Sequence, residues 1–109
     1  MLPVMHTAFA GIQSAQRGLQ VVANNVANLN TDGYRAQRYD PSSGEVRPRH
    51  DPPPQAPEDA VLPPSDVDLA EEFIDLKRYE VRLRAGAKVL DVADNMLGRL
   101  LDIFDDREP

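Results

Sequence analysis

The chain contains neither cysteine nor tryptophan, and its only aromatic residues are three tyrosines and three phenylalanines among 109 residues. Without cysteine it can form no disulfide bond and perform no thiol chemistry. No stretch approaches the roughly 20 consecutive apolar residues that a membrane-spanning helix requires, so we expect no membrane insertion. Basic residues are also outnumbered, because the net charge is −6. This balance argues against a nucleic acid as the partner.

Signatures of catalysis are equally scarce. The chain has no G-x-S-x-G elbow, no phosphate-binding loop and no paired catalytic constellation. Its only histidines, His6 and His50, have no cysteine or carboxylate at metal-ligand spacing. We therefore predict a protein that is not an enzyme and that has no catalytic residue, no metal site and no cofactor.

The N-terminal residues resemble a secretory signal in one respect only. Residues 1–12 are fairly apolar, and Ala8-Phe9-Ala10 has the small-x-small pattern of a cleavage site. A signal peptide begins with positive charge, however, and the first basic residue is Arg17. We expect no cleaved signal peptide.

An amphipathic helix is predicted over about residues 3–29. Its apolar positions alternate in spacing between three and four, as in a heptad seam: Met5, Ala8, Ile12, Ala15, Leu19, Val22, Val26 and Leu29. Small residues at Ala8, Gly11, Ala15 and Gly18 keep this helix thin, which favours close approach of a second helix. Alternatively, the glycines only weaken the helix, by about 1 kcal/mol each relative to alanine.

The centre of the chain is predicted to be irregular. Asn30-Thr31-Asp32-Gly33 has the composition of a turn, and eight of the ten prolines fall within residues 41–64. Proline removes a backbone donor and fixes φ, so we expect neither helix nor central strand there.

A second, longer helix is predicted over about residues 66–105, with Ser65 or Asp66 as its N-cap. One apolar row recurs at every seventh residue: Leu69, Leu76, Leu83, Leu90, Leu97 and Phe104. Phe73, Ala87 and Leu101 occupy the partner row, where Glu80 and Asp94 interrupt the apolar pattern. These carboxylates must face water or a basic neighbour, such as Arg84 for Glu80.

A further apolar row appears late in this helix and comprises Val89, Ala93, Met96, Leu100 and Ile103. One partner helix cannot bury both rows, so the pattern indicates several helical neighbours. A four-helix bundle made of two hairpins would also cover both faces.

Asparagines gather at the end of the first helix, at Asn24, Asn25, Asn28 and Asn30. Each amide offers two donors and an acceptor, which favours bonding between helices or between subunits. The alternative is that they satisfy free carbonyls at the helix terminus. Tyr34 is expected to pack its ring against the helix pair.

Two segments resemble a known family. Residues 23–37 read ANNVANLNTDGYRAQ, and the second helix carries Val67-Asp68-Leu69, Glu72-Phe73-Ile74, residues 87–90 as AKVL, Ala93-Asp94 and Met96-Leu97. Both resemble the terminal signatures of the bacterial flagellar rod and hook axial proteins. The chain departs from the family at residues 80–86, which read EVRLRAG, and in lacking a large β-rich central domain. The second departure suggests either a small rod-type member of the proximal class or an atypical paralogue.

The resemblance implies a structural subunit of the flagellar basal-body rod, located in the periplasmic space after type III export. Its partners would be itself, other axial proteins and the export apparatus. The alternative function is a soluble helical-hairpin binding module, an export chaperone or regulator that forms a closed dimer or heterodimer.

The predicted fold is all-α: two long amphipathic helices form an antiparallel coiled-coil hairpin joined by a proline-rich irregular loop. Its segments are residues 1–38, 39–64 and 65–109. The predicted partner interface consists of Ile12, Leu19, Val22, Asn24, Asn25, Val26, Asn28, Leu29, Tyr34, Leu69, Phe73, Leu76, Leu83, Leu90, Met96, Leu97, Leu100, Leu101 and Phe104.

Overall fold

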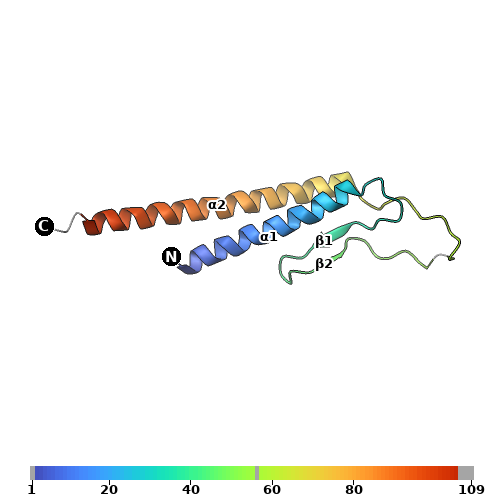
Figure 1. Cartoon of the computed structure of the whole chain (residues 1–109), viewed down its shortest axis with the longest axis horizontal. Helices are drawn as coiled ribbons and strands as arrows, with labels where there is room; N and C mark the ends of the chain where they lie inside the picture. Colours follow the sequence, from blue (N-terminus) through green and yellow to red (C-terminus); the bar gives the residue numbers. More distant parts are fainter. Residues whose placement is uncertain (1, 56, 106–109) are drawn as a thin grey trace.

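The computed structural model describes residues 2–55 and 57–105 and confirms the helical hairpin (Figure 1). Helix α1 spans Leu2–Ala27 and helix α2 spans Leu69–Asp105. The two helices run antiparallel. Between them in the sequence are strands β1, Gln37–Tyr39, and β2, Val46–Pro48. The molecule is a thin rod with extents of 84 × 22 × 14 Å.

Local capping sets the ends of α1. Pro3 lies in the first turn, where its missing N–H is not needed, and its carbonyl accepts a 2.9 Å bond from the Thr7 hydroxyl. At the other end, Asn28 Nδ2 donates to the Asn24 carbonyl at 2.8 Å. Gly33 follows with φ 79, a left-handed conformation suited to the turn after a helix. The helix therefore ends two residues earlier than predicted.

The N-cap of α2 is Asp68, so the prediction of Ser65 or Asp66 was wrong. Asp68 Oδ1 accepts a bond from the Ala70 N–H at 2.9 Å. Ser65 and Asp66 instead bind the segment that follows α1. The Ser65 hydroxyl donates to the Leu29 carbonyl, and Asp66 accepts from the Ala36 N–H. The 37 residues of α2 give a helix of about 55 Å.

The surface of α2 that packs on α1 is rotated by one residue from the predicted one. Glu72, Tyr79 and Ala93 are buried at seven-residue multiples, and Gly86 completes this row against Ile12. Phe73, Ala87 and Leu101 are exposed, so the predicted partner row was wrong. Leu83 and Leu90, from the other predicted row, are half-buried.

This rotation explains the two carboxylates that interrupted the predicted row. Glu80 and Asp94 do not face α1. Glu80 pairs with Arg84 at 2.7 Å, as the four-residue spacing predicted, and Asp94 is exposed. Neither carboxylate is desolvated by the packing of the two helices.

Two glycines let the helices approach closely. A Cβ atom at Gly18 would overlap the ring of Tyr79, and one at Gly86 would come within 2.7 Å of Ile12 Cγ1. A Cβ atom at Gly11 would meet nothing within 4 Å. The expectation of close packing is confirmed at Gly18 and was wrong at Gly11.

A short β-hairpin, which the sequence did not predict, extends into the segment expected to be irregular. Its sheet has two strands, so neither is a central strand, and the expectation for residues 41–64 is met. β1 and β2 pair antiparallel, with Arg38 opposite Arg47 and Tyr39 opposite Val46. The turn is closed by Asp40, whose carbonyl accepts the Gly44 N–H at 2.8 Å, and Gly44 has φ 75. Pro48 is tolerated because it ends an edge strand.

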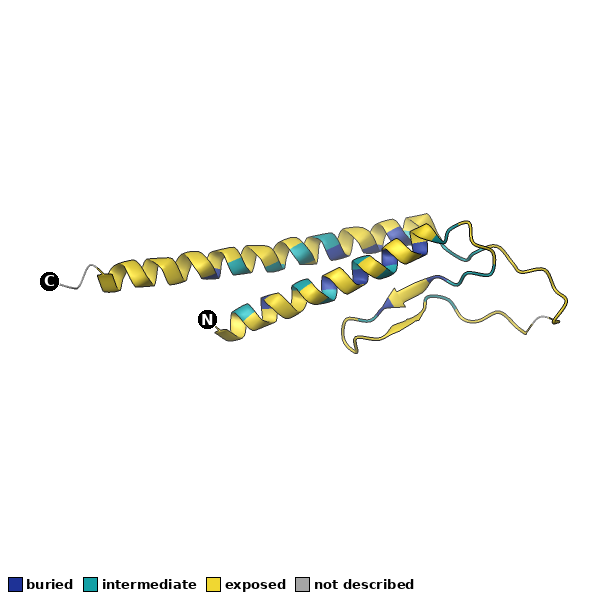
Figure 2. Ribbon diagram, viewed as in Figure 1, coloured by how far each residue is buried: buried dark blue, intermediate teal, exposed yellow. Residues whose placement is uncertain are grey.

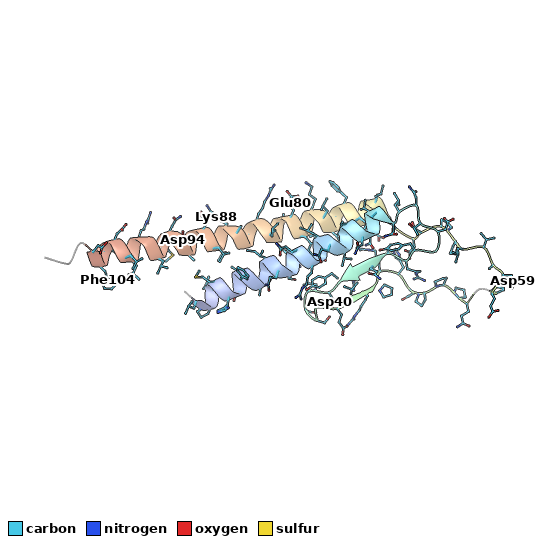
Figure 3. All side chains as sticks on the ribbon, in the orientation of Figure 1. Asp40, Asp59, Glu80, Lys88, Asp94 and Phe104 are labelled. Atoms are coloured by element: carbon cyan, nitrogen blue, oxygen red, sulfur yellow. The ribbon has the colours of Figure 1, made fainter. Side chains whose placement is uncertain are left out.

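Buried residues are concentrated where the β-hairpin packs against α1 and α2 (Figure 2). Tyr39 of β1 is buried beside Tyr79, whose hydroxyl donates to the Tyr39 carbonyl at 3.4 Å. Ala15 and Val22 of α1 complete this small core. Toward the C-terminal end of α2 the side chains project outward on all sides (Figure 3).

Candidate functional site

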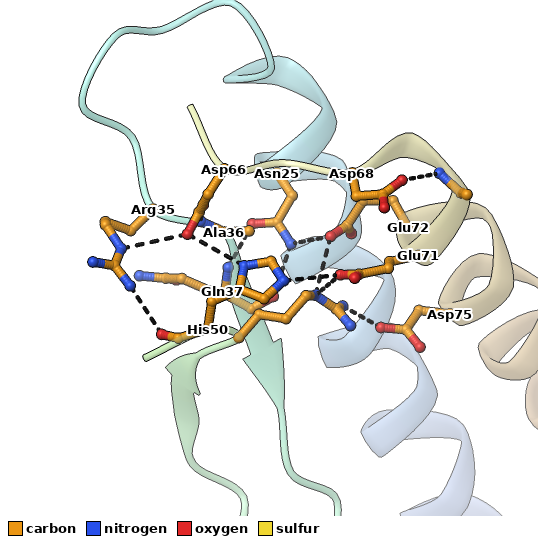
Figure 4. A network of polar contacts seen from close by, with 12 residues as sticks. Asn25, Arg35, Ala36, Gln37, His50, Asp66, Asp68, Glu71, Glu72 and Asp75 are labelled. Carbon is orange, nitrogen blue, oxygen red and sulfur yellow. Dashed lines mark hydrogen bonds and ion pairs between the residues drawn. The ribbon is translucent and has the colours of Figure 1, made fainter. Parts of the chain in front are cut away.

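Two features stand out: a polar cluster at the closed end of the hairpin and a set of exposed apolar side chains on α2. The polar cluster joins α1, the following turn, β2, the end of the loop and the first turns of α2 (Figure 4). Its charged and amide members include Asn25, Arg35, Arg49, His50, Asp66, Glu71, Glu72 and Asp75.

Asn25 is fully buried at the centre of this cluster, and its amide makes four hydrogen bonds. Nδ2 donates to Glu72 Oε1 at 2.9 Å and to the Gln37 carbonyl at 2.8 Å. Oδ1 accepts from the Tyr34 hydroxyl at 2.8 Å and from the Gln37 N–H at 2.9 Å. One side chain thus ties α1 to α2, to the turn and to β1.

The positive charge of Arg49 lies beside three negatively charged carboxylates of α2. Its Nε lies 3.4 Å from Glu72 Oε1 and 3.6 Å from Glu71 Oε2, and its Nη2 binds Asp75. The side chains of Arg49 and Glu72 are only 12% and 2% exposed, so removing either partner would leave the other charge buried.

Burial raises the pKa of Glu72, and the neighbouring Asp75 and Glu71 add to this rise. The Asn25 hydrogen bond and the Arg49 charge oppose it without cancelling it. Glu72 therefore ionises less readily in the folded chain than a solvated glutamate does.

Asp66 fixes the end of the loop to the turn after α1. Its Oδ2 lies 3.4 Å from Arg35 Nε and 3.3 Å from His50 Nδ1, while His50 Nε2 lies 3.3 Å from Glu71. Partial burial of Asp66 favours its neutral form, but the bonds from Ala36 and His50 and the charge of Arg35 outweigh it, and the pKa of Asp66 is lowered.

The other asparagines of the predicted amide group lie outside this cluster. Asn28 bonds within its own helix end, where Nδ2 donates to Asn24 and Oδ1 accepts from the Thr31 hydroxyl at 3.1 Å. Asn24 and Asn30 are exposed. Bonding between helices thus holds for Asn25, and the alternative, satisfaction of helix-end carbonyls, holds for Asn28.

The remaining residues of the predicted interface differ in how far they are buried. Val22 is buried in the hairpin core. Six residues are half-buried: Ile12, Leu19, Leu29, Tyr34, Leu83 and Leu90. Nine are exposed: Val26, Leu69, Phe73, Leu76, Met96, Leu97, Leu100, Leu101 and Phe104. The hairpin itself therefore covers little of the apolar surface of α2.

The last part of α2 extends beyond the start of α1. Leu90 lies beside Leu2 and Met5, and Ala93 is the last buried residue of the helix. Every residue from 94 to 105 is exposed (Figure 2). We call residues 94–105 the α2 overhang; at 1.5 Å per residue it is about 18 Å long.

Pattern analysis missed several residues of the polar cluster. Glu72 and Asp66 were visible as acidic residues near a helix start, but Arg49 and Gln37 carried no local signal. Within residues 2–55 and 57–105, no helix is long and apolar enough to cross a membrane. Among the same residues, no group of three or more His, Cys, Asp or Glu side chains is arranged so that it could hold a metal ion.

Comparison with protein families addresses the resemblance directly. Residues 5–35 match the model of the flagella basal body rod protein family. The resemblance to flagellar rod proteins is confirmed. The matched segment covers most of α1 and the turn through Arg35, and thus includes Asn25 and Tyr34 of the polar cluster. The matched segment is 31 of the 109 residues, and it is similar to rod proteins of the flagellar basal body. No curated protein matches the chain.

Proposed function

We propose that this chain is a structural, non-catalytic subunit of the flagellar rod that assembles with copies of itself through coiled-coil packing of α1 and α2. The observation that carries the proposal is the exposed apolar surface of α2. Leu97, Leu100, Leu101 and Phe104 are 44–59% exposed in the single chain. An isolated domain rarely leaves so much contiguous apolar surface in water.

The location of this surface supports packing against further helices. Leu97 and Phe104 continue the row that contains Leu83 and Leu90, beyond the point where α1 can cover it. Burial of apolar area contributes about 25 cal/mol per Å². Helices from neighbouring subunits would therefore stabilise the overhang as they cover it.

The polar cluster has a supporting role in this proposal. It fixes the angle between α1 and α2 at the closed end, because Asn25, Glu72 and Arg49 bond across the two helices and the hairpin. A subunit with a rigid closed end presents its open end in a defined geometry. In the proposal, the protein reaches the periplasmic rod by type III export, and other axial proteins are its neighbours.

Aspartate substitution in the overhang tests the proposal. Leu97→Asp and Leu101→Asp should reduce self-association at a given concentration by about tenfold or more, because each would bury a charge in the contact. Val61→Asp is the matched control, since Val61 is 94% exposed in the loop. Sedimentation velocity measures the effect. Unchanged association in both overhang variants would contradict the proposal.

A further inference from the structure

The charges of α2 are segregated along its length. Residues 77–88, here called the basic segment, carry one carboxylate, Glu80, and five basic side chains: Lys77, Arg78, Arg82, Arg84 and Lys88. Residues 91–105, here called the acidic segment, carry one basic residue, Arg99, and four aspartates: Asp91, Asp94, Asp102 and Asp105. The acidic segment includes the whole α2 overhang.

Most of this charge is free to meet a partner. The side chains of Arg78, Arg84 and Lys88 are 70%, 79% and 75% exposed. Four of the five basic side chains pair with a carboxylate of the same helix, from Arg84 with Glu80 at 2.7 Å to Lys88 with Asp91 at 3.9 Å, but the basic partners stay at least 58% exposed. Exposed pairs of this kind contribute little stability, so they leave the basic segment available.

An apolar stripe connects the two segments on the side of α2 that faces away from α1. Val81, Val92 and Ile103 are spaced eleven residues apart, as are Ile74, Ala85 and Met96, and all six are exposed. Eleven residues make almost exactly three helical turns, so these side chains share one face. A helix lying along this stripe would contact basic residues at one level and aspartates at another.

We infer that the acidic segment of one copy packs against the basic segment of α2 in a second copy, with the two helices parallel and staggered along their axes. The inference rests on the proposed function and names the contact by which copies join. Because the two segments lie at different heights on the same helix, the pair as a whole retains one unfilled acidic segment and one unfilled basic segment. Such a head-to-tail contact does not close and so permits open-ended growth.

The choice of a second copy as the occupant follows from charge complementarity. The chain as a whole is acidic, and the basic segment is its most concentrated positive surface on a helix. The overhang supplies aspartates together with Met96 and Ile103 of the apolar stripe, which are 56% and 53% exposed. Complementary charges set the register of such a contact, while apolar burial supplies most of its free energy.

Charge reversal in each segment, separately and together, tests the inference. The first variant carries Arg82→Glu and Lys88→Glu, and the second carries Asp91→Lys and Asp102→Lys. Each should weaken self-association by about tenfold or more, because like charges then face each other. The variant with all four substitutions should recover association to within about threefold of the unaltered chain. An equimolar mixture of the two double variants should recover it likewise.

A matched control separates these contacts from net charge. Glu58→Lys with Asp59→Lys changes the charge as much as the acidic-segment variant does, but at exposed loop positions. It should leave association unchanged. Far-ultraviolet circular dichroism verifies that every variant keeps its helix content, and Arg82→Gln with Lys88→Gln provides a milder version if the reversal disturbs folding.

The outcomes distinguish this inference from the proposed function. Recovery in the fourfold variant with open-ended growth supports both. Recovery that stops at a fixed dimer supports a contact between the two segments but overturns the parallel arrangement and the rod proposal. If the fourfold variant stays as weak as the double variants, or if the double variants associate normally, the inference is wrong even where the chain still assembles.

Discussion

The ring of Tyr79 lies directly over Gly18, so that a methyl group at position 18 would overlap it, with Cε2 only 2.6 Å away. This contact fixes the closest approach of α1 and α2. Ala15 and Val22, one turn on either side of Gly18, are buried against the same region. The close packing of the two helices therefore requires glycine at position 18.

Gly18→Ala should destabilise the chain by about 1–3 kcal/mol, because the Tyr79 ring must move and the helices must separate. The change works against helix propensity, which alone would stabilise by about 1 kcal/mol. Gly11→Ala is the control: its added methyl meets nothing within 4 Å, so only the propensity gain remains. Urea unfolding of dilute protein, followed by circular dichroism, measures both. Equal stabilisation by the two substitutions would refute the close contact.

Gly86→Ala should also destabilise the hairpin, since the new Cβ would lie 2.7 Å from Ile12 Cγ1 and 3.2 Å from the Ala8 carbonyl oxygen. Ile12→Ala removes the nearer obstacle. The double variant should therefore be more stable than the sum of the two single effects, by about 0.5 kcal/mol or more. A double-mutant cycle from urea unfolding gives this coupling, and strictly additive effects would contradict the packing described.

Asn25→Ala should cost at least about 2 kcal/mol of unfolding free energy. The substitution removes four hydrogen bonds and leaves buried groups of Glu72 and Gln37 without their partner. Asn24→Ala, one position earlier and exposed, should change stability by less than about 0.5 kcal/mol. Thermal unfolding at low concentration compares them, and similar losses for both would show that Asn25 is not the centre of the cluster.

Asp66 and Glu72 should affect the pH dependence of the unfolding free energy in opposite directions. The pKa of Asp66 is lowered on folding, so its stabilisation is present above the unfolded value of about 3.9 and disappears as the pH falls through the folded value. The pKa of Glu72 is raised, so its contribution declines as the pH rises from about 4.3 through the folded value.

Consequently, the rise in unfolding free energy between about pH 3 and pH 7 should be shallower in Asp66→Asn and steeper in Glu72→Gln than in the unaltered chain. Urea unfolding across that range measures the slopes. Asp59→Asn, on the exposed loop, provides the reference for loss of one acidic group. Slopes that change in the same direction in both variants would contradict the assigned shifts.

The helices were predictable because their apolar spacing persists over many turns, but the contact surface of α2 was not. Apolar residues alone favoured Phe73 and Ala87, whereas the helix buries Glu72 and Tyr79. Burial of Glu72 depends on Asn25, which lies 47 residues away in the sequence, and on Arg49 of the loop. No local pattern reveals a compensation between such distant groups.

The β-hairpin was missed for a related reason. Its strands are three residues long, too short for alternation to be detected, and proline at positions 41 and 48 argued against pairing. The turn residues between them, Asp40 to Gly44 with two serines, were the available signal. The strands are stabilised because Tyr39 packs into the core beside Tyr79, which lies 40 residues away in the sequence.

The most direct test of the central claim is the mass of the purified chain as a function of concentration, measured by light scattering with circular dichroism on the same samples. The rod account predicts masses that increase without a limiting value, together with a gain in helix signal as the α2 overhang becomes covered. A fixed dimer, fully helical when dilute and unchanged on concentration, would contradict that account and support the closed binding module.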